Sequence, residues 1–157
     1  MIRKLKETDI EELFVIFESS YPSNPTIRKK PFFDWYYKNS PYNKSDDYSF
    51  LIATSEDQAI RAFIGYIPLE FVTPNGIIKV YLTANWYSVV RGIDGILIIE
   101  NLFSRFENFL MIGITPESLP IYQEYDRSSL VQLLDPLEFS TAVLDVDSVV
   151  NQFPETI

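Results

Sequence analysis

The 157-residue sequence contains neither cysteine nor histidine. The absence of cysteine excludes disulfides and thiolate metal sites, and nothing in the sequence indicates secretion. The absence of histidine removes the commonest metal ligand and the commonest general base. We therefore predict no metal site, and any acid–base chemistry must use Asp, Glu, Tyr, Lys, water or the substrate itself.

Positive charge is also scarce. The chain has 13 Lys and Arg against 22 Asp and Glu, which gives a formal net charge of −9 at pH 7. Such a chain is a poor partner for nucleic acid and for anionic membrane surfaces. No apolar run reaches transmembrane length, and the polar N-terminus does not resemble a signal peptide, so we expect a cytoplasmic protein.

Apolar residues, by contrast, are plentiful. Hydrophobic residues make up 46% of the chain and aromatic residues 15%, which is enough to bury the core of one domain without disulfides or metals. We expect one domain over residues 1–145. Residues 146–157 have too little core to stand alone, and are interpreted as a tail or as the start of a further segment.

Hydrophobic periodicity predicts a mixture of strands and helices. Strands at 49–54, 59–72 and 77–90 should form an antiparallel meander, because Asn75-Gly76 is typical of a type I′ hairpin turn. Pro68 interrupts the second strand, which predicts an edge position or a bulge there. Helices are expected near 9–19 and 31–38, after residue 96 and after residue 115, and further strands at 2–6, 109–114, 129–134 and 139–144.

Glycine is rare, yet two of the five glycines stand three residues apart in the turn Arg91-Gly92-Ile93-Asp94-Gly95. An aromatic and β-branched strand precedes this turn. Apolar residues at helical spacing follow it, namely Ile96, Ile99, Phe103, Phe106 and Leu110. A strand, a glycine turn and a helix can aim unpaired helix N–H groups at an anion. The same pattern also makes a tight turn that binds nothing, and spacing alone leaves both interpretations open.

The order of these elements resembles the GNAT superfamily of acyl-CoA-dependent N-acyltransferases across nearly the whole chain. Arg91 is similar to the first position of the family's Q/R-x-x-G-x-G/A loop, which binds pyrophosphate. Residues 111–115 and 121–125 resemble the family's fifth strand and tyrosine-bearing helix. The resemblance implies an α+β fold with a mostly antiparallel central sheet and helices on both faces. It also implies acetyl-CoA as cofactor and a small amine as acceptor, with an amino sugar as one candidate.

The resemblance also implies a set of site residues. The candidate cofactor-binding residues are Trp86 and Ser88 on the strand and Arg91, Gly92 and Gly95 in the turn.

Two residues are candidates for catalysis. Tyr122 falls on the tyrosine that often protonates the leaving CoA thiolate in this family. Glu70 is the only carboxylate in the meander placed to act as a base through water. Each also has a simpler interpretation. Tyr122 can be a helix tyrosine packed on the core, and Glu70 can be a solvated glutamate on an edge strand. The amine is expected to attack the thioester directly, since the chain has no Cys and no His to activate a Ser.

The turn departs from the family pattern at two positions, because Asp94 stands where the first motif glycine belongs and Ile96 where the last glycine or alanine belongs. Two like charges about 4 Å apart repel by about 4 kcal/mol at a surface-like dielectric. We expect the Asp94 carboxylate to lie in the first helical turn and to accept hydrogen bonds from backbone N–H groups.

Two functions therefore remain open. One is an active N-acyltransferase with an unusual phosphate loop. The other is a catalytically inactive GNAT-like domain with a structural or interaction role. Such a domain would pair with a second GNAT-like domain or with a second copy of the chain.

Aromatic residues are concentrated between Phe32 and Tyr42. This cluster can line a hydrophobic or sugar-stacking acceptor slot, or it can cover one face of the sheet. Composition does not separate the two.

Overall fold

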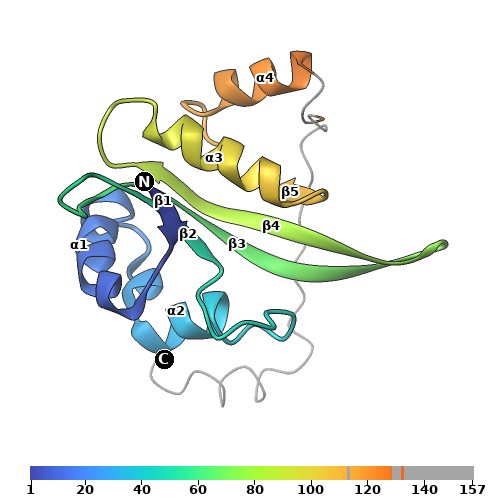
Figure 1. Ribbon diagram of the computed structural model, residues 1–157, viewed down its shortest axis with the longest axis horizontal. Coiled ribbons are helices and arrows are strands. Elements are labelled where there is room, and N and C mark those ends of the chain that lie inside the picture. The colour runs from blue at the N-terminus through green and yellow to red at the C-terminus, as the bar shows by residue number, and fades with distance from the viewer. Residues whose placement is uncertain (113, 129–131, 133–157) are drawn as a thin grey trace. The chain divides into compact units, whose positions relative to one another are not determined.

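The computed structural model describes residues 1–112, 114–128 and 132 (Figure 1). The chain divides into two compact units, Met1–Ile114 and Thr115–Ile157. The second unit contains the helix α4 (Leu119–Arg127). The predicted strands at 129–134 and 139–144, the boundary at residue 145 and the segment 146–157 lie outside the described residues, apart from residue 132.

A single five-stranded sheet forms the centre of the first unit, in the order β1-β2-β3-β4-β5. β1 to β4 run antiparallel to their neighbours, and β5 runs parallel to β4. The predicted meander is therefore confirmed. The strands are β1 (Ile2–Lys4), β2 (Phe50–Thr54), β3 (Ile60–Thr73), β4 (Gly76–Ser88) and β5 (Phe109–Met111).

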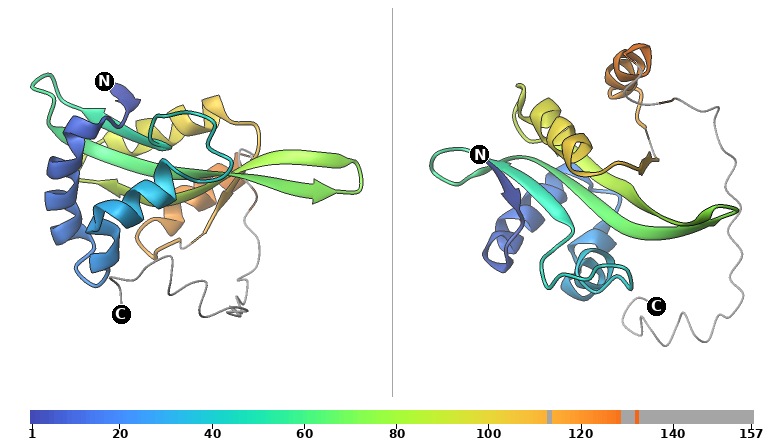
Figure 2. Two further views of the ribbon diagram at one scale, coloured as in Figure 1. Left: turned by 90° about the horizontal axis from the view of Figure 1, so that it is seen from below. Right: turned by 45° about the vertical axis from the view of Figure 1, so that its right-hand side comes forward.

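Helices cover both faces of this sheet, as expected. Figure 2 shows α1 (Ile10–Ser20) and α2 (Lys30–Tyr37) on one face and α3 (Asp94–Arg105) on the other. Short 3₁₀ segments at Glu7–Asp9 and Pro25–Arg28 lead into α1 and α2.

The hairpin between β3 and β4 lies at the predicted position, but its turn is of a different type from the one predicted. Thr73 pairs with Gly76, so the two central residues of the turn are Pro74 and Asn75. The proline ring holds φ negative at the first of these, and only Gly76 has a positive φ, of 122°. The expected type I′ turn at Asn75-Gly76 is therefore wrong. The Thr73 hydroxyl instead donates to the Gly76 carbonyl at 2.7 Å and accepts from the Asn75 N–H at 3.3 Å.

The edge position predicted for Pro68 is confirmed. The Tyr66 N–H donates to the Ser49 carbonyl at 2.9 Å, at the edge of β3 that faces β2. Two residues further on, Pro68 presents its nitrogen to the same edge, beyond the end of β2. No ladder hydrogen bond is lost there, which is where a strand tolerates proline.

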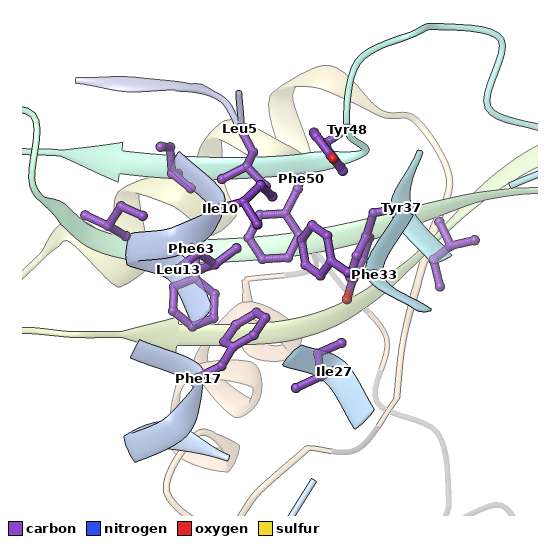
Figure 3. Packing of buried hydrophobic residues seen from close by; sticks show 13 residues of the cluster. Leu5, Ile10, Leu13, Phe17, Ile27, Phe33, Tyr37, Tyr48, Phe50 and Phe63 are labelled. Carbon is purple, nitrogen blue, oxygen red and sulfur yellow. The ribbon is translucent and has the colours of Figure 1, made fainter. Parts of the chain in front are cut away.

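The main core lies between the sheet and the helices α1 and α2 (Figure 3). Aromatic rings dominate it, with the Phe17 and Phe63 centroids 5.3 Å apart in an edge-to-face contact. Phe33 and Tyr37, from the aromatic cluster on α2, are fully buried in this core. That part of the cluster therefore covers the sheet, while Trp35 is 44% exposed.

On the opposite face, α3 buries Gly95, Ile98, Ile99 and Leu102. The predicted apolar stripe is correct at Ile99, which is fully buried, and wrong at Ile96, which is 37% exposed. The phase follows from a close approach of α3 to β4. A Cβ atom added at Gly95 would lie 3.1 Å from the Cβ of Ser88, so only glycine fits easily there.

Candidate functional site

The pairing of β4 with β5 covers only a short part of β4. In the described residues, β5 pairs with Tyr81, Leu82 and Thr83. From Ala84 to Ser88, β4 stays paired with β3 on its other edge. The edge of β4 that continues past β5 therefore presents backbone N–H and C=O groups that an extended ligand carrying amides could bind.

A β-bulge interrupts β4 beside this open edge. Phe63 pairs with Tyr87 and Gly65 with Ala84, so Asn85 and Trp86 together face one residue of β3. Asn85 has a φ of 54°, a conformation that Asn adopts more readily than most residues. Bulges re-aim backbone groups and are frequent next to active sites.

Both bulge side chains are anchored. Asn85 Nδ2 donates to the hydroxyl of the buried Tyr37 at 2.6 Å. On the α3 face, the Trp86 indole Nε1 donates to the Gly95 carbonyl at 2.9 Å. The bulge is thus held from both sides of the sheet.

The glycine turn leads from β4 to the start of α3. The first helical hydrogen bond runs from the Leu97 N–H to the Ile93 carbonyl at 2.8 Å. The N–H groups of Asp94, Gly95 and Ile96 donate to no other residue of the described chain. They carry the partial positive charge of a helix N-terminus.

The Asp94 carboxylate does not bond these N–H groups, contrary to our expectation. Asp94 is the first residue of α3, as expected, but its Oδ2 pairs with Arg61 Nε of β3 at 2.8 Å. A charge-assisted bond to a guanidinium is stronger than a bond to a neutral amide, which explains the choice of partner. The helix N–H groups are therefore left available, and the aspartate charge is compensated.

The structure brings together the candidate cofactor-binding residues. Gly95 packs on Ser88 and on the Trp86 indole, and the Ser88 hydroxyl donates to the Val90 carbonyl at 2.8 Å. The Trp86 side chain thus bonds to α3 and the Ser88 side chain to the turn, so both side chains are engaged within the protein. Arg91 and Gly92 are exposed in the turn, and Arg91 forms no ion pair with a described residue.

The two candidate catalytic residues belong to different units of the chain. Glu70 lies opposite Lys79 in the β3–β4 ladder near the hairpin end of β3, about six residues from the bulge or roughly 20 Å along the strand. The structure does not bring Glu70 to the turn. Tyr122 belongs to α4 in the second unit, where it is buried. Burial raises the pKa of its phenol, which keeps the hydroxyl protonated.

Sequence reasoning missed Arg61 and Asn85. Nothing in the sequence indicates Arg61, because its partner Asp94 lies 33 residues away. Asn85 did carry a signal, since Asn is depleted in strands and tolerates positive φ, which together indicate a bulge.

Two other kinds of site are not found in the part of the chain that is described. Asp, Glu, His and Cys side chains do not gather there in threes as metal ligands. None of the described helices combines the length and the apolar character that a membrane crossing requires.

No protein-family model matches the sequence, and no curated protein matches it. Solved structures do match. A predicted acetyltransferase from Clostridium acetobutylicum, crystallised with acetyl-CoA, has a TM-score of 0.63 at 17% identity over 92% of this chain and 96% of that chain. Glucosamine-6-phosphate N-acetyltransferase from Arabidopsis thaliana has a TM-score of 0.63 at 14% identity, over 92% and 98% of the two chains.

A third match is an aminoglycoside acetyltransferase from an uncultured soil metagenomic sample. Its TM-score is 0.60 at 15% identity, over 91% of this chain and 97% of that chain. At such identities the likeness concerns the arrangement of the elements rather than the chemistry of the site. The chain has the fold of the GNAT acetyltransferases.

Proposed function

We propose that this protein is an acyl-CoA-dependent N-acyltransferase that transfers an acetyl group from acetyl-CoA to a small amine. The observation that carries the proposal concerns the described residues, among which the edge of β4 beyond Thr83 is open and the N–H groups that begin α3 have no partner. One neighbour in fold was crystallised with acetyl-CoA. Two others are named for an amino sugar and for aminoglycosides, which supports an amino sugar as one candidate acceptor.

The residues present fit such a cofactor. The backbone of β4 between Ala84 and Ser88 offers hydrogen bonds to the amides of a pantetheine arm. The N–H groups of Asp94, Gly95 and Ile96 offer donors to a pyrophosphate, because a helix N-terminus favours anions. Arg91 is a cation within the turn itself, and it forms no ion pair with a described residue.

The proposed reaction steps follow from the functional groups that the chain offers. A neutral amine attacks the thioester carbonyl, a C–N bond forms and the C–S bond breaks. Backbone N–H groups at the bulge near Trp86 stabilise the developing oxyanion. The leaving thiolate takes up a proton, for which Tyr122 is the candidate donor implied by the family resemblance, and water accepts the proton of the amine. The position of Glu70 gives no support to a role as base.

A second candidate is the GNAT-like domain without activity. One observation favours it, because large apolar side chains are exposed around the turn. Ile93 is 67% exposed and Val90 42% exposed, beside the half-exposed Ile96 and Leu97. Clustered apolar surface of this kind often marks a protein contact. The partner would be a second GNAT-like domain or a second copy of the chain.

Thermal unfolding with added acetyl-CoA and CoA separates the two candidates. A ligand at a hundred times its dissociation constant stabilises the folded state by about 2.7 kcal/mol. Adenosine, which lacks the pantetheine arm and the pyrophosphate, is the control and should give no shift. The absence of a shift at millimolar acetyl-CoA would contradict the proposal, and a mass in solution above that of one chain would then support the second candidate.

Transfer itself can be followed through the CoA thiol that is released. The chain has no cysteine, so a thiol reagent reports the product without background from the protein. Glucosamine 6-phosphate and an aminoglycoside are the first acceptors to test. CoA release that depends on the acceptor is the expected result.

A further inference from the structure

A hollow of about 420 Å³ lies on the α3 side of the sheet, beyond the C-terminal end of that helix. Its lining includes Tyr66 and Tyr81 from β3 and β4, and Phe106 directly after α3. The loop 42–49 before β2 forms another wall. The volume is within the usual range for small-molecule sites.

Aromatic rings form the apolar part of this hollow. The rings of Tyr81 and Phe106 stack with centroids 3.7 Å apart and an interplanar angle of 17°. The Tyr66 ring lies 5.0 Å from Phe106. Surfaces of this kind bind flat rings by stacking.

Tyr66 brings a hydroxyl donor to the hollow. The residue is 6% exposed, and its hydroxyl makes no hydrogen bond to any described residue. Burial raises the pKa of this phenol, so it stays protonated and able to donate. Because Tyr66 lines the hollow, its hydroxyl is available to an acceptor bound there.

Positive charge gathers around the hollow although the whole chain is acidic. Four cations and only two carboxylates line it. Lys44, Lys79 and Arg105 form no ion pair within the described chain, whereas Lys4 is paired with Asp47 at 2.9 Å. Arg105 uses Nε for the Asn101 side chain at 2.7 Å, which leaves the outer face of its guanidinium for another acceptor.

The loop wall is preformed. The side-chain nitrogen of Asn43 donates to the carbonyls of Tyr37, Lys38 and Asp47 at 3.1–3.2 Å. Its side-chain oxygen accepts from the Ser45 N–H at 3.2 Å. Because this wall is already ordered in the free protein, a ligand does not lose binding free energy by ordering it.

We propose that this hollow binds a small organic anion that carries a flat ring. Its carboxylate or phosphate group would contact Arg105, Lys79 and the Tyr66 hydroxyl, and its ring would stack on the outer face of the Tyr81–Phe106 pair. α3 has 12 residues and is about 18 Å long. The hollow at its C-terminal end is therefore separate from the proposed acyl-CoA site at its N-terminal end, and this inference does not depend on the proposed function.

The test is an NMR titration of the full ¹⁵N-labelled chain with phenyl phosphate and, separately, with benzoate. Saturable shifts should appear at Ser45, Lys79 and Arg105, and the tighter of the two probes identifies the anionic group that the hollow prefers. Inorganic phosphate lacks the ring and benzyl alcohol lacks the charge. Each should bind at least about tenfold more weakly than the better probe, because it loses either the stacking or the charge-assisted bonds.

Variants locate the site. Arg105→Gln and Lys79→Gln should each weaken binding of the better probe by about tenfold. Lys29→Gln makes the same change in net charge at an exposed position outside the hollow, and should leave the affinity within about twofold. Tyr66→Phe should weaken binding several-fold without lowering the melting temperature, since its hydroxyl has no protein partner to lose.

Three results would overturn the inference. One is equal affinity for benzyl alcohol and the ring anions. Another is an equal loss for Arg105→Gln and Lys29→Gln, which would mean that only the net charge matters. The third is a set of shifts confined to residues outside the hollow.

Discussion

Replacing Asp94 with asparagine tests how the turn accommodates an anion. In the wild type, the Asp94 carboxylate pairs with Arg61 at 2.8 Å, with side chains 27% and 37% exposed. Asp94→Asn keeps the size of the side chain and removes its charge. The Arg61 guanidinium then stays near the helix N-terminus without a compensating anion, so the turn gains one positive charge.

The expected magnitudes differ between folding and binding. A half-exposed ion pair contributes about 0.2–1 kcal/mol, and an acid in the first helical turn about 0.3–1 kcal/mol. The variant should lose about 1 kcal/mol of stability, or a few degrees in melting temperature. For CoA, like charges about 4 Å apart repel by about 4 kcal/mol at an effective dielectric of 20, which bounds the effect from above. After screening, we expect CoA to bind roughly tenfold more tightly.

Isothermal titration with CoA at two salt concentrations measures this effect. Arg61→Gln should act in the opposite direction, because it leaves the Asp94 carboxylate unpaired at the anion site. The double variant should return close to wild-type affinity. Asp46→Asn, an exposed change of equal charge, controls for the net charge of the protein. Weaker CoA binding by Asp94→Asn, or the same direction of change for both single variants, would refute this reasoning.

Other predictions follow from particular contacts. Gly65→Ala should lower the free energy of unfolding in urea by about 1–3 kcal/mol, because a Cβ there would overlap the buried ring of Tyr37; an unchanged midpoint would contradict this packing. Tyr122→Phe should reduce acetyl turnover with little change in acetyl-CoA affinity, and unchanged turnover would remove Tyr122 from the mechanism. Two hydrogen bonds to Arg3, at 2.6 and 2.8 Å, lower the pKa of the Asp9 carboxyl, so this pair should stabilise the fold above about pH 4 and lose its effect as pH falls through the folded-state pKa. Asp9→Asn should therefore flatten the acid side of the stability–pH profile, and an unchanged profile would argue against it.

The sequence predicted those features of the fold that local patterns determine. Apolar and β-branched runs, with the turn signal at residues 74–76, identified the three strands of the meander, and Pro68 indicated the edge where β3 extends past β2. Helical spacing identified α1 and α2. Each of these signals is contained within a window of about ten residues, which is why one sequence was enough.

Details that depend on tertiary contacts could not be predicted in this way. The contact between Gly95 and Ser88 determines which face of α3 is turned toward the sheet. The apolar pattern of α3 does not determine it, because Ile96 is as hydrophobic as Ile99. The type of the hairpin turn depends on whether Thr73 pairs with Gly76, a register that composition does not determine. A two-residue window centred on Asn75-Gly76 was therefore misleading.

The candidate site was predictable in part for the same reason. The strand, glycine turn and helix are continuous in sequence, and Trp86, Ser88 and Gly95 lie against one another in the structure, while their role in binding a cofactor stays a prediction. The partner of Asp94 comes from another strand, so the carboxylate was assigned to the helix N–H groups instead of to Arg61. The hollow at the other end of α3 is assembled from residues between Lys4 and Phe106, and no local pattern indicates it.

The most direct measurement is amide hydrogen exchange of the full chain with and without saturating CoA. An acyl-CoA site at the open edge of β4 predicts slower exchange in two segments, 84–88 on the strand and 94–96 at the start of α3. The hairpin tip around Pro74 should not change, and it serves as the internal control. Unchanged exchange in both segments under conditions where CoA is bound would contradict the assignment of the site.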